Sequence, residues 1–576
     1  MNGADTEEMI YHLKPEQDFK VLLLYPNLSM LLAPPLSFAI FTGLLRKRRY
    51  QVEIFDVTGY VGEGATARAE NVSVGDEMNT LRAETERAGD DVTFQVASTE
   101  EHMVEMMQSR PFSYEKDLGV QSKTGLYEDF VEKIESFKPD LILTSIVEDT
   151  FFQTIKLMSL IFEKKIPTLH GGVFVTAAPE LALSYPGVDM IGIGEGEQIV
   201  LDVADRIRRG VSCDDVPGVW INDEHGSIVK NRRGPLFDFK QVIPDYSLFE
   251  AERFHRPMGG RFFKSVTIEA YRGCPYTCAY CNSPMQTTLA AESGLGNYVR
   301  RAPFGGFRDY IASVVEQVHP TFIMFADDSF LARPKKEIEL FCEVYEEFKI
   351  PFWFNTRPEN VTSENLGMLK DVNCYRMSFG LECGNEEFRA KVLLRPLKNG
   401  ILIEKFKIIA EAGIPFSINN IIGFPNETRE LIFETIELNR QISAYDALTV
   451  SCFVPYHGTV LRDRAVEQGL VDKDSIVCDL HHSTLNMPQL PVEEIDGLLR
   501  TFPLYVHFDK SVWPDIKRAE TFDDEGDKIF RRLSTRYQEE AFSLDQNDKI
   551  KASMKVSGSV GCDSNELDSF RLLPAR

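Results

Sequence analysis

Positive charge is scarce in this sequence. Its 576 residues include 63 Lys and Arg against 88 Asp and Glu, which gives a formal net charge of −25. A nucleic-acid-binding groove or a surface for anionic membranes needs the opposite balance, so neither is expected as the main function. The hydrophobic share of 43% and the charged share of 26% are ordinary for a globular protein. A chain of this length should fold into roughly two to four domains.

A disulfide framework is also missing. The ten cysteines are scattered from Cys213 to Cys562 without the paired spacing of a secreted, disulfide-rich domain. We find no secretory signal. These features predict a cytoplasmic protein in a reducing compartment.

No uninterrupted hydrophobic run is long enough for a convincing membrane span. Residues 21–45 carry no charge and precede the basic residues 46–49, a pattern that could be a membrane helix. Pro26, Pro34 and Pro35 interrupt the run, and proline breaks helices. A strand, a loop and a helix explain this segment better, so we expect no membrane association.

What the sequence does contain is a cluster of three cysteines, Cys274, Cys278 and Cys281, in C-x3-C-x2-C spacing. A strand-like run over 266–271 precedes them, which places three thiolates on one loop. A structural zinc site uses four ligands, usually in two pairs, and no second pair follows. An iron–sulfur cluster with one open iron fits better, because thiolate is its natural ligand. A zinc site and three core cysteines are the alternatives.

Together with Tyr280 and the preceding Arg272-Gly273, this loop resembles the C-x3-C-x-aromatic-C signature of radical S-adenosylmethionine (SAM) enzymes. The resemblance implies that the cysteines bind a [4Fe–4S] cluster and that SAM chelates the open iron. One electron would then cleave SAM to methionine and a 5′-deoxyadenosyl radical. A reductase with flavodoxin or ferredoxin would be the electron donor.

Strands and helices alternate over residues 18–212, after a polar tail at 1–17. Five strands with helices between them predict a doubly wound parallel sheet of flavodoxin-like order, with a ligand at the carboxyl ends of its strands. The expected strands are 21–26, 52–57, 141–147, 168–172 and 190–194, and the expected helices are 37–48, 127–137, 151–162 and 197–209.

A dinucleotide is a poor candidate for that ligand. No Gly-x-Gly-x-x-Gly turn follows the first strand. The glycine-rich stretch 192–197 contains Glu195 and Glu197, whose carboxylates would repel a pyrophosphate. A tight turn from strand to helix is the alternative explanation of these glycines.

A doubly wound domain ahead of this cysteine loop resembles the cobalamin-binding domain of cobalamin-dependent radical SAM enzymes. Many cobalamin domains carry Asp-x-His-x-x-Gly, whose histidine ligates cobalt, but here Asp56 is followed by Val57 and Thr58. The resemblance therefore implies cobalamin without a histidine ligand from this loop. The residues that it assigns to cobalamin are Pro34, Thr58, Ser145, Gly171, Gly172, Gly194, Glu195 and Gly196.

Two segments differ from the regular pattern. Residues 61–126 are polar and acidic, which predicts a surface insertion in the first domain; a cover over cobalamin or substrate is the alternative. Residues 213–262 combine short strands with Pro, Gly and Asn-Asp turns, which predicts a linker between domains.

A second alternation covers 263–475. Six expected strands end at Tyr271, Ala326, Phe354, Leu381, Ile422 and Phe453, with helices between them. Six β/α units suit the partial barrel of radical SAM enzymes, and barrel chemistry lies at the carboxyl ends of the strands. Residues 476–576 predict a mostly helical lid or substrate domain with a loose tail.

Polar residues follow the expected strand ends. By resemblance, Asp327 and Asp328 would contact the SAM amino group, although capping of the next helix is the alternative. Arg357 could clamp the SAM carboxylate. Glu382 could bind the ribose or the amino group. The remaining residues assigned to SAM are Tyr280, Arg395 for the carboxylate, and Gly423 and Glu427 near the adenine.

The sixth strand ends before Tyr456 and His457, which we expect on the substrate side. His457 could act as an acid or base, whereas the turn that contains it could be purely structural. Cys383 and Cys452 are expected to pack in the interior rather than react.

The sequence thus predicts an α/β protein with a doubly wound cobalamin domain, a partial (β/α)6 barrel and helical C-terminal elements. The favoured function is a cobalamin-dependent radical SAM enzyme that methylates an unactivated carbon of a small-molecule substrate. Oxidative cyclisation or rearrangement without methyl transfer is one alternative, and a non-catalytic cobalamin or cluster sensor is another.

Overall fold

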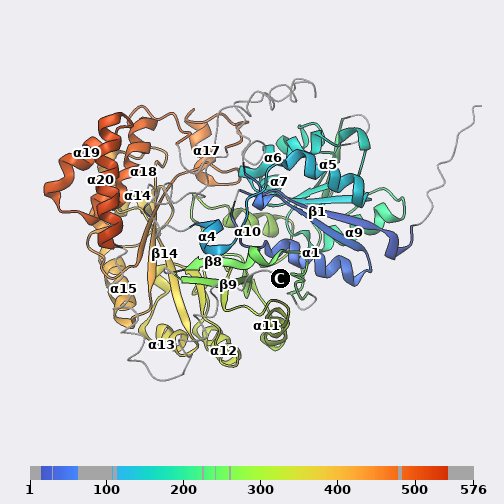
Figure 1. The fold of residues 1–576 in the computed structure, drawn as a ribbon, viewed down its shortest axis with the longest axis horizontal. Helices are drawn as coiled ribbons and strands as arrows, with labels where there is room; N and C mark the ends of the chain where they lie inside the picture. The colour runs from blue at the N-terminus through green and yellow to red at the C-terminus, as the bar shows by residue number, and fades with distance from the viewer. Residues whose placement is uncertain are drawn as a thin grey trace, which may run out of the picture.

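The computed structural model describes residues 14–28, 30–61, 107, 113–222, 226–239, 242–258, 261–477 and 483–541. Two α/β domains lie side by side, with the first domain in blue to cyan and the second in green to yellow (Figure 1). The C-terminal helices, in red, lie at the end of the molecule opposite the first domain (Figure 1). This two-domain α/β arrangement confirms the predicted fold class.

The sheet of the first domain has the strand order β2-β1-β3-β4-β5-β6-β7. Strands β1 to β5 are parallel, in the predicted flavodoxin-like order, and β6 and β7 add an antiparallel edge. The strands are β1 (Lys20–Tyr25), β2 (Gln51–Asp56), β3 (Leu141–Ser145), β4 (Thr168–Gly171), β5 (Met190–Gly192), β6 (Val219–Asn222) and β7 (Ile228–Lys230).

Helices cover both faces of this sheet, as the runs of buried apolar residues in β1 and β3 require. One hydrophobic cluster joins the sheet to α1 and α9, and a second joins it to α5 and α6. The helices are α1 (Leu36–Lys47), α4 (Tyr114–Leu118), α5 (Leu126–Phe137), α6 (Phe151–Ser159), α7 (Val173–Ala177), α8 (Pro179–Leu183) and α9 (Gly196–Arg208).

The two segments that depart from the regular sequence pattern, 61–126 and 213–262, have different structures where they are described. The hairpin of β6 and β7, inside the expected linker 213–262, extends the first sheet. Of the expected insertion 61–126, most lies outside the described residues; α4 is described and packs with Met30, Leu32 and Val120. In the described part of the chain, no helix has the length and apolarity that a membrane crossing requires.

The second sheet has the order β16-β15-β14-β13-β12-β9-β8. Six of its strands are parallel and β8 pairs antiparallel with β9, so the predicted six-unit half-barrel is confirmed. The strands are β8 (His255–Met258), β9 (Arg261–Ile268), β12 (Phe322–Phe325), β13 (Phe352–Thr356), β14 (Cys374–Glu382), β15 (Phe416–Ile422) and β16 (Ala447–Cys452).

Some helices of the second domain cover the outer side of this sheet, and others lie toward the first domain (Figure 1). Helices alternate with the strands along the chain. They are α10 (Ser283–Glu292), α11 (Phe304–Val318), α12 (Lys335–Tyr345), α13 (Ser363–Asp371), α14 (Glu386–Lys391), α15 (Asn399–Ala412), α16 (Arg429–Asn439) and α17 (Val460–Glu467). The C-terminal region is helical as expected, with α18 (Val492–His507) against β16, followed by α19 (Trp513–Ala519) and α20 (Asp524–Ala541).

Candidate functional site

The three-cysteine loop lies between the short strand β10 (Tyr271–Arg272) and the start of α10. Neighbouring elements fix its backbone from two sides. The N–H of Ala279 donates to the carbonyl of Leu393 at 3.0 Å, and the carbonyl of Ala279 accepts from the N–H of Leu461 at 2.9 Å. These bonds hold the loop at the carboxyl end of the half-barrel, where the sequence placed it.

The cysteine thiols suit a cluster better than a single ion. Burial raises the pKa of Cys274 to about 11 and that of Cys281 to about 12, and metal binding would deprotonate both. Cys281 Sγ accepts from the N–H of Ser283 at 3.4 Å, and Cys278 Sγ from Arg357 Nη1 at 3.5 Å. In the described residues no three His, Cys, Asp or Glu side chains converge on one ion. In the [4Fe–4S] cluster that the resemblance implies, each thiolate would bind its own iron.

The neighbouring aspartates after β12 have different surroundings. Asp327 is buried and accepts from the N–H groups of Ala270 and Tyr271 at 2.9 and 3.2 Å, and it also pairs with Arg333. Its carboxylate therefore fastens β12 to the segment that leads into the cysteine loop. Asp328 is open to solvent and accepts from Ser283 Oγ at 2.8 Å. The surrounding protein still raises the pKa of Asp328 through desolvation. Of the two, Asp328 has the carboxylate that a ligand could reach.

Arg357 follows β13 and lies against the cysteine loop. Its guanidinium stacks 3.7 Å from the ring centre of Tyr276 and pairs with Glu359. Because the same guanidinium contacts Cys278 Sγ, Arg357 places a positive charge beside the predicted cluster. A carboxylate bound there would meet both the charge and the planar donors of an arginine.

Glu382, Arg395 and Tyr280 form one buried group behind the loop. Arg395 Nη1 donates to Glu382 Oε1 at 3.0 Å and to the Tyr280 hydroxyl at 3.2 Å, and Nη2 donates to the carbonyl of Gly380 at 2.5 Å. Burial raises the pKa of Glu382. A Cβ at position 380 would lie 2.0 Å from Glu382 Oε1, so a larger residue there would displace this carboxylate from its present position. Both terminal nitrogens of the Arg395 guanidinium therefore already donate to protein groups, and its predicted contact with the SAM carboxylate stays a prediction.

Gly423 and Glu427 close the turn after β15. One carboxylate oxygen of Glu427, Oε2, accepts from the N–H groups of Gly423 and Phe424 at 2.7 and 3.1 Å. Its other oxygen, Oε1, is buried without a hydrogen-bond partner in the described structure. The structure thus gives Glu427 a role in shaping the turn, and its predicted place near adenine stays a prediction.

The buried carboxyl of Glu427 predicts a pH effect on stability. Burial raises its pKa from 4.5 to about 8, so the folded chain keeps a proton that the unfolded chain releases. The free energy of unfolding should therefore fall as pH rises from about 4.5 to about 8, and fall less in Glu427→Gln. Denaturant unfolding at several pH values measures this difference. Parallel curves for the two proteins would contradict it.

Six of the eight residues predicted to bind cobalamin line one cavity of about 290 Å³ in the first domain. They are Ser145, Gly171, Gly172, Gly194, Glu195 and Gly196. The cavity lies at the carboxyl ends of β3, β4 and β5, beside the N-termini of α1 and α9, and five glycines border it. A glycine-lined cavity at this edge of a doubly wound sheet lies where such a domain binds its ligand.

Pro34 and Thr58 lie outside this cavity, in loops at the same edge of the sheet. Thr58 Oγ1 accepts from Asn27 Nδ2 at 2.7 Å, which joins the loops after β1 and β2. Pro34 is buried in the loop whose carbonyls at Leu32 and Ala33 accept from Arg253. Both residues therefore belong to a fixed rim, and their predicted contact with cobalamin stays a prediction.

Arg272, directly before the cysteine loop, connects the two domains. Its Nη1 lies 3.1 Å from Glu195 Oε1 and 2.8 Å from Glu197 Oε1 of the first domain, and Nη2 lies 2.9 Å from Glu269 Oε2. Arg300 also pairs with Glu195. Arg272 and Glu269 line the same cavity as the glycines, so the cavity of the first domain reaches the cysteine loop.

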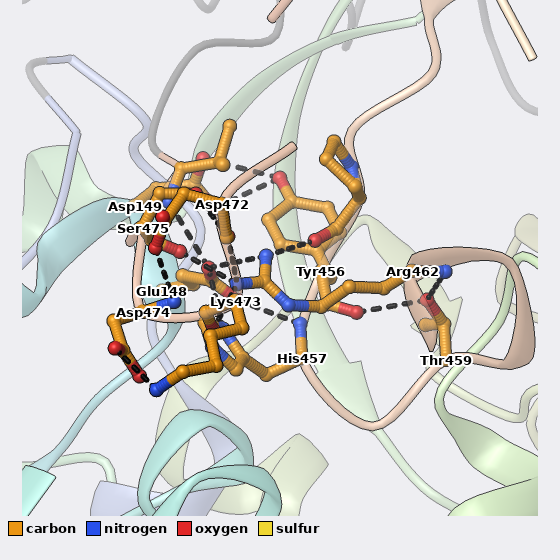
Figure 2. Close-up of polar contacts among 12 residues, drawn as sticks. Glu148, Asp149, Tyr456, His457, Thr459, Arg462, Asp472, Lys473, Asp474 and Ser475 are labelled. Carbon is orange, nitrogen blue, oxygen red and sulfur yellow. Dashed lines mark hydrogen bonds and ion pairs between the residues drawn. The ribbon is translucent and has the colours of Figure 1, made fainter. Parts of the chain in front are cut away.

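Tyr456 and His457 form a second connection between the domains (Figure 2). His457 Nδ1 lies 2.8 Å from Glu148 Oε1, and the N–H of His457 donates to Glu148 Oε2 at 2.9 Å. The Tyr456 hydroxyl donates to Asp149 at 3.0 and 3.1 Å. Glu148 and Asp149 belong to η3 (Glu148–Thr150), shortly after β3 of the first domain. Arg462 completes the group by donating to the carbonyls of Pro455 and Ser475 at 2.7 Å (Figure 2).

Sequence reasoning missed these connections. Glu148 was not singled out, Arg272 was noted only as part of the cysteine-loop resemblance, and Glu195 was assigned to cobalamin rather than to an ion pair. The only available signal was the position of Arg272 close to the cysteines, because its two partners in the first domain, Glu197 and Glu195, lie 75 and 77 residues earlier in the chain. A single sequence does not reveal which oppositely charged residues form ion pairs when they lie so far apart in the chain.

Two parts of the chain match models of known families. Residues 268–438 match the model of the radical SAM superfamily, and residues 105–204 match the model of the B12 binding domain. The first range begins at the end of β9 and includes the cysteine loop; the second includes Ser145, the glycines after β4 and β5, and Glu195. Arg272, within the first matched range, pairs with Glu195 and Glu197, within the second, so the two matched regions are in contact.

Individual relatives differ in their named activities. An uncharacterised methyltransferase of Pyrococcus horikoshii is 24% identical over 365 residues, which span 60% of this chain and 73% of the relative. The anaerobic magnesium-protoporphyrin IX monomethyl ester cyclase of Rubrivivax gelatinosus is 27% identical over 333 residues, which span 55% of this chain and 57% of the relative. The chain thus spans little more than half of the length of the cyclase.

Among solved structures, the chain has the fold of the radical S-adenosylmethionine methyltransferase TsrM from Kitasatospora setae, determined with cobalamin and a [4Fe–4S] cluster bound. The TM-score is 0.53 at 14% identity, over 91% of this chain and 100% of that one. This likeness shows that the two proteins share their fold across both domains.

Proposed function

The chain is an enzyme of the radical SAM superfamily that carries a B12-binding domain, and from this premise we propose that it methylates an unactivated carbon of a small-molecule substrate with cobalamin as its second cofactor. The cavity lined by both domains is the observation that carries the proposal. The glycines after β4 and β5 line it on one side, and Arg272, two residues before Cys274, lines it on the other. A cobalamin bound near the glycines and a cluster bound by the cysteine loop would then face the same active site.

Three cysteines of this chain would hold the cluster, and the strand ends would hold SAM. A [4Fe–4S] cluster with SAM supplies a 5′-deoxyadenosyl radical, and cobalamin supplies a carrier for the methyl group. Asp328 offers a carboxylate for the SAM amino group, and Arg357 offers a guanidinium for its carboxylate. Glu382, held by Arg395 and Tyr280, offers a second carboxylate at the end of β14. An external flavodoxin or ferredoxin system would deliver the electron.

Tyr456 and His457 are the proposed residues on the substrate side. Glu148 fixes His457 through Nδ1, and the second ring nitrogen, Nε2, has no hydrogen-bond partner in the described structure. That nitrogen is the one that could exchange a proton with a substrate. Asp149 holds Tyr456 at the same junction.

A second candidate is radical cyclisation without methyl transfer, which the similarity to an anaerobic cyclase favours. The two reactions differ in the fate of the SAM methyl group. With SAM labelled in its methyl group, we expect the label in the product of any accepted substrate, together with 5′-deoxyadenosine. Product formed with 5′-deoxyadenosine but without label would support the cyclase instead. If no 5′-deoxyadenosine forms under strong reductant with any candidate substrate, a sensor function gains support.

A further inference from the structure

The thiols of the cysteine loop accept two kinds of hydrogen bond. The backbone N–H of Ser283 donates to Cys281 Sγ at 3.4 Å, and the guanidinium of Arg357 donates through Nη1 to Cys278 Sγ at 3.5 Å. Within the described residues, Arg357 is the one charged side chain that donates to a thiol of this loop. It follows β13, 79 residues after Cys278 in the chain, so the fold of the half-barrel brings the two side chains together.

Two further contacts fix the guanidinium of Arg357 in this place. It stacks 3.7 Å from the ring centre of Tyr276, a residue of the same loop, and the Tyr276 hydroxyl donates to Asn360 Oδ1 at 2.6 Å. The Nη2 atom of Arg357 pairs with Glu359, and the Arg357 side chain is only 12% exposed. The protein itself therefore orients this donor toward the sulfur.

The carboxylate of Glu359 leaves the hydrogen bond to sulfur in place. Glu359 pairs with Nη2 of Arg357, whereas the bond to sulfur comes from Nη1, so the two partners use different nitrogens of one guanidinium. Glu359 Oε2 also lies 3.9 Å from Arg395 Nη2, and its charge is thus shared between two arginines. Glu359 offsets part of the charge of Arg357 at long range, but the N–H that meets the sulfur acts at contact distance.

Such a donor affects how readily a bound cluster accepts an electron. A [4Fe–4S] cluster that takes up one electron gains one negative charge, part of which lies on the thiolate sulfurs. A charged donor to a thiolate stabilises the reduced cluster more than the oxidised cluster, and hydrogen bonds to the sulfurs are among the features that set the reduction potential. Low exposure strengthens the effect, because little water competes for the sulfur.

We propose that Arg357, acting through Cys278, raises the reduction potential of the [4Fe–4S] cluster. This inference goes beyond the contact with the SAM carboxylate proposed above, and it rests on the proposed binding of the cluster by the three cysteines. The reduction transfers one electron from the external flavodoxin or ferredoxin to the oxidised cluster, with no bond formed or broken. A higher potential lets a weaker reductant populate the reduced cluster that cleaves SAM.

A redox titration of the cluster tests this proposal. The full chain and its Arg357→Met, Arg357→Lys and Arg308→Met variants are reconstituted anaerobically with iron and sulfide, and the iron content is measured. Each protein is then titrated with dithionite in the presence of redox mediators, and the signal of the reduced cluster is followed by electron paramagnetic resonance. SAM is left out, so its carboxylate contributes nothing to the measured potential. Arg308 is the control, because it lies on α11 and is 51% exposed.

We expect Arg357→Met to keep about four iron atoms per chain. Its reduction equilibrium should shift about tenfold toward the oxidised cluster, which for a one-electron couple lowers the midpoint potential by about 59 mV. Arg357→Lys should lie between this variant and the unaltered chain, because an ammonium keeps the charge but not the planar donors. Arg308→Met should match the unaltered chain. An unchanged potential in Arg357→Met, or an equal shift in Arg308→Met, would overturn the inference.

The iron content separates the remaining outcomes. If Arg357→Met loses its iron, the potential of Arg357→Lys decides: a lowered value supports the inference, and a value equal to that of the unaltered chain overturns it. Loss of iron in both variants also overturns it, because Arg357 would then hold the loop in place rather than set the potential. If the unaltered chain assembles no [4Fe–4S] cluster, the assignment of the cysteine loop fails, and with it the proposed function.

Discussion

Replacement of Cys274 by Ala should abolish reductive cleavage of SAM. Two thiolates cannot hold a [4Fe–4S] cluster that leaves one iron open for SAM, so the variant should lose both the cluster and the site at which SAM is reduced. We expect iron and sulfide content to fall after anaerobic reconstitution. Formation of 5′-deoxyadenosine under dithionite should fall by at least about a thousandfold, to the uncatalysed background.

A matched control separates this effect from a general loss of a cysteine. Cys342 lies on α12, at the outer side of the half-barrel, and Cys342→Ala should keep its iron and its 5′-deoxyadenosine formation. The Cys278→Ala and Cys281→Ala variants should behave as Cys274→Ala does. If the Cys274→Ala protein retained a four-iron cluster and cleaved SAM, the assignment of this loop as the cluster site would be wrong.

Replacement of Arg272 by Met should cause the largest loss of stability. The side chains of Arg272, Glu197 and Glu269 are 15%, 5% and 15% exposed, and Arg272 is the only ion-pair partner of these two carboxylates in the described structure. Breaking a buried pair by removing one partner typically costs about 3–5 kcal/mol, because the remaining charge stays buried. Because the entropy of unfolding grows with chain length, the thermal midpoint of this 576-residue chain should fall by about 2–4 °C.

The surface pair of Arg308 and Glu347 provides the control. Both side chains are 51% exposed, so Arg308→Met should cost no more than about 1 kcal/mol. Adding Glu197→Gln to Arg272→Met should recover part of the loss, since it removes one of the stranded charges. If Arg272→Met and Arg308→Met shifted the midpoint equally, the connection between the domains would not have the importance assigned to it.

Much of the fold could be predicted because local patterns determine it. The apolar runs of β1 and β3 have the length of buried parallel strands, and the periodic segments between strands became helices within a few residues of the expected bounds. The strand order of the first sheet followed from the rules for doubly wound domains. The hairpin of β6 and β7 was assigned to a linker, because short strands rich in turn residues do not reveal which sheet they join.

The candidate site was predictable where its residues are close in sequence. The three cysteines stood out by their spacing, and the glycines predicted from their position after strands line one cavity, while their roles in binding cofactors stay predictions. The sequence could not predict that Asp327 is buried and paired while Asp328 is exposed. This difference depends on the contacts of Asp327 with Arg333 and with the backbone N–H of Ala270. The same holds for Glu195, which pairs across the domain interface.

The methyl group of SAM provides the most direct test of the central claim. The protein is reconstituted anaerobically with iron, sulfide and hydroxocobalamin, reduced, and mixed with SAM that carries a deuterated methyl group. The corrinoid is then extracted and analysed by mass spectrometry. A cobalamin-dependent methyltransferase should return a large fraction of the corrinoid with the deuterated methyl group attached. A corrinoid that stays unlabelled while 5′-deoxyadenosine accumulates would contradict methyl transfer.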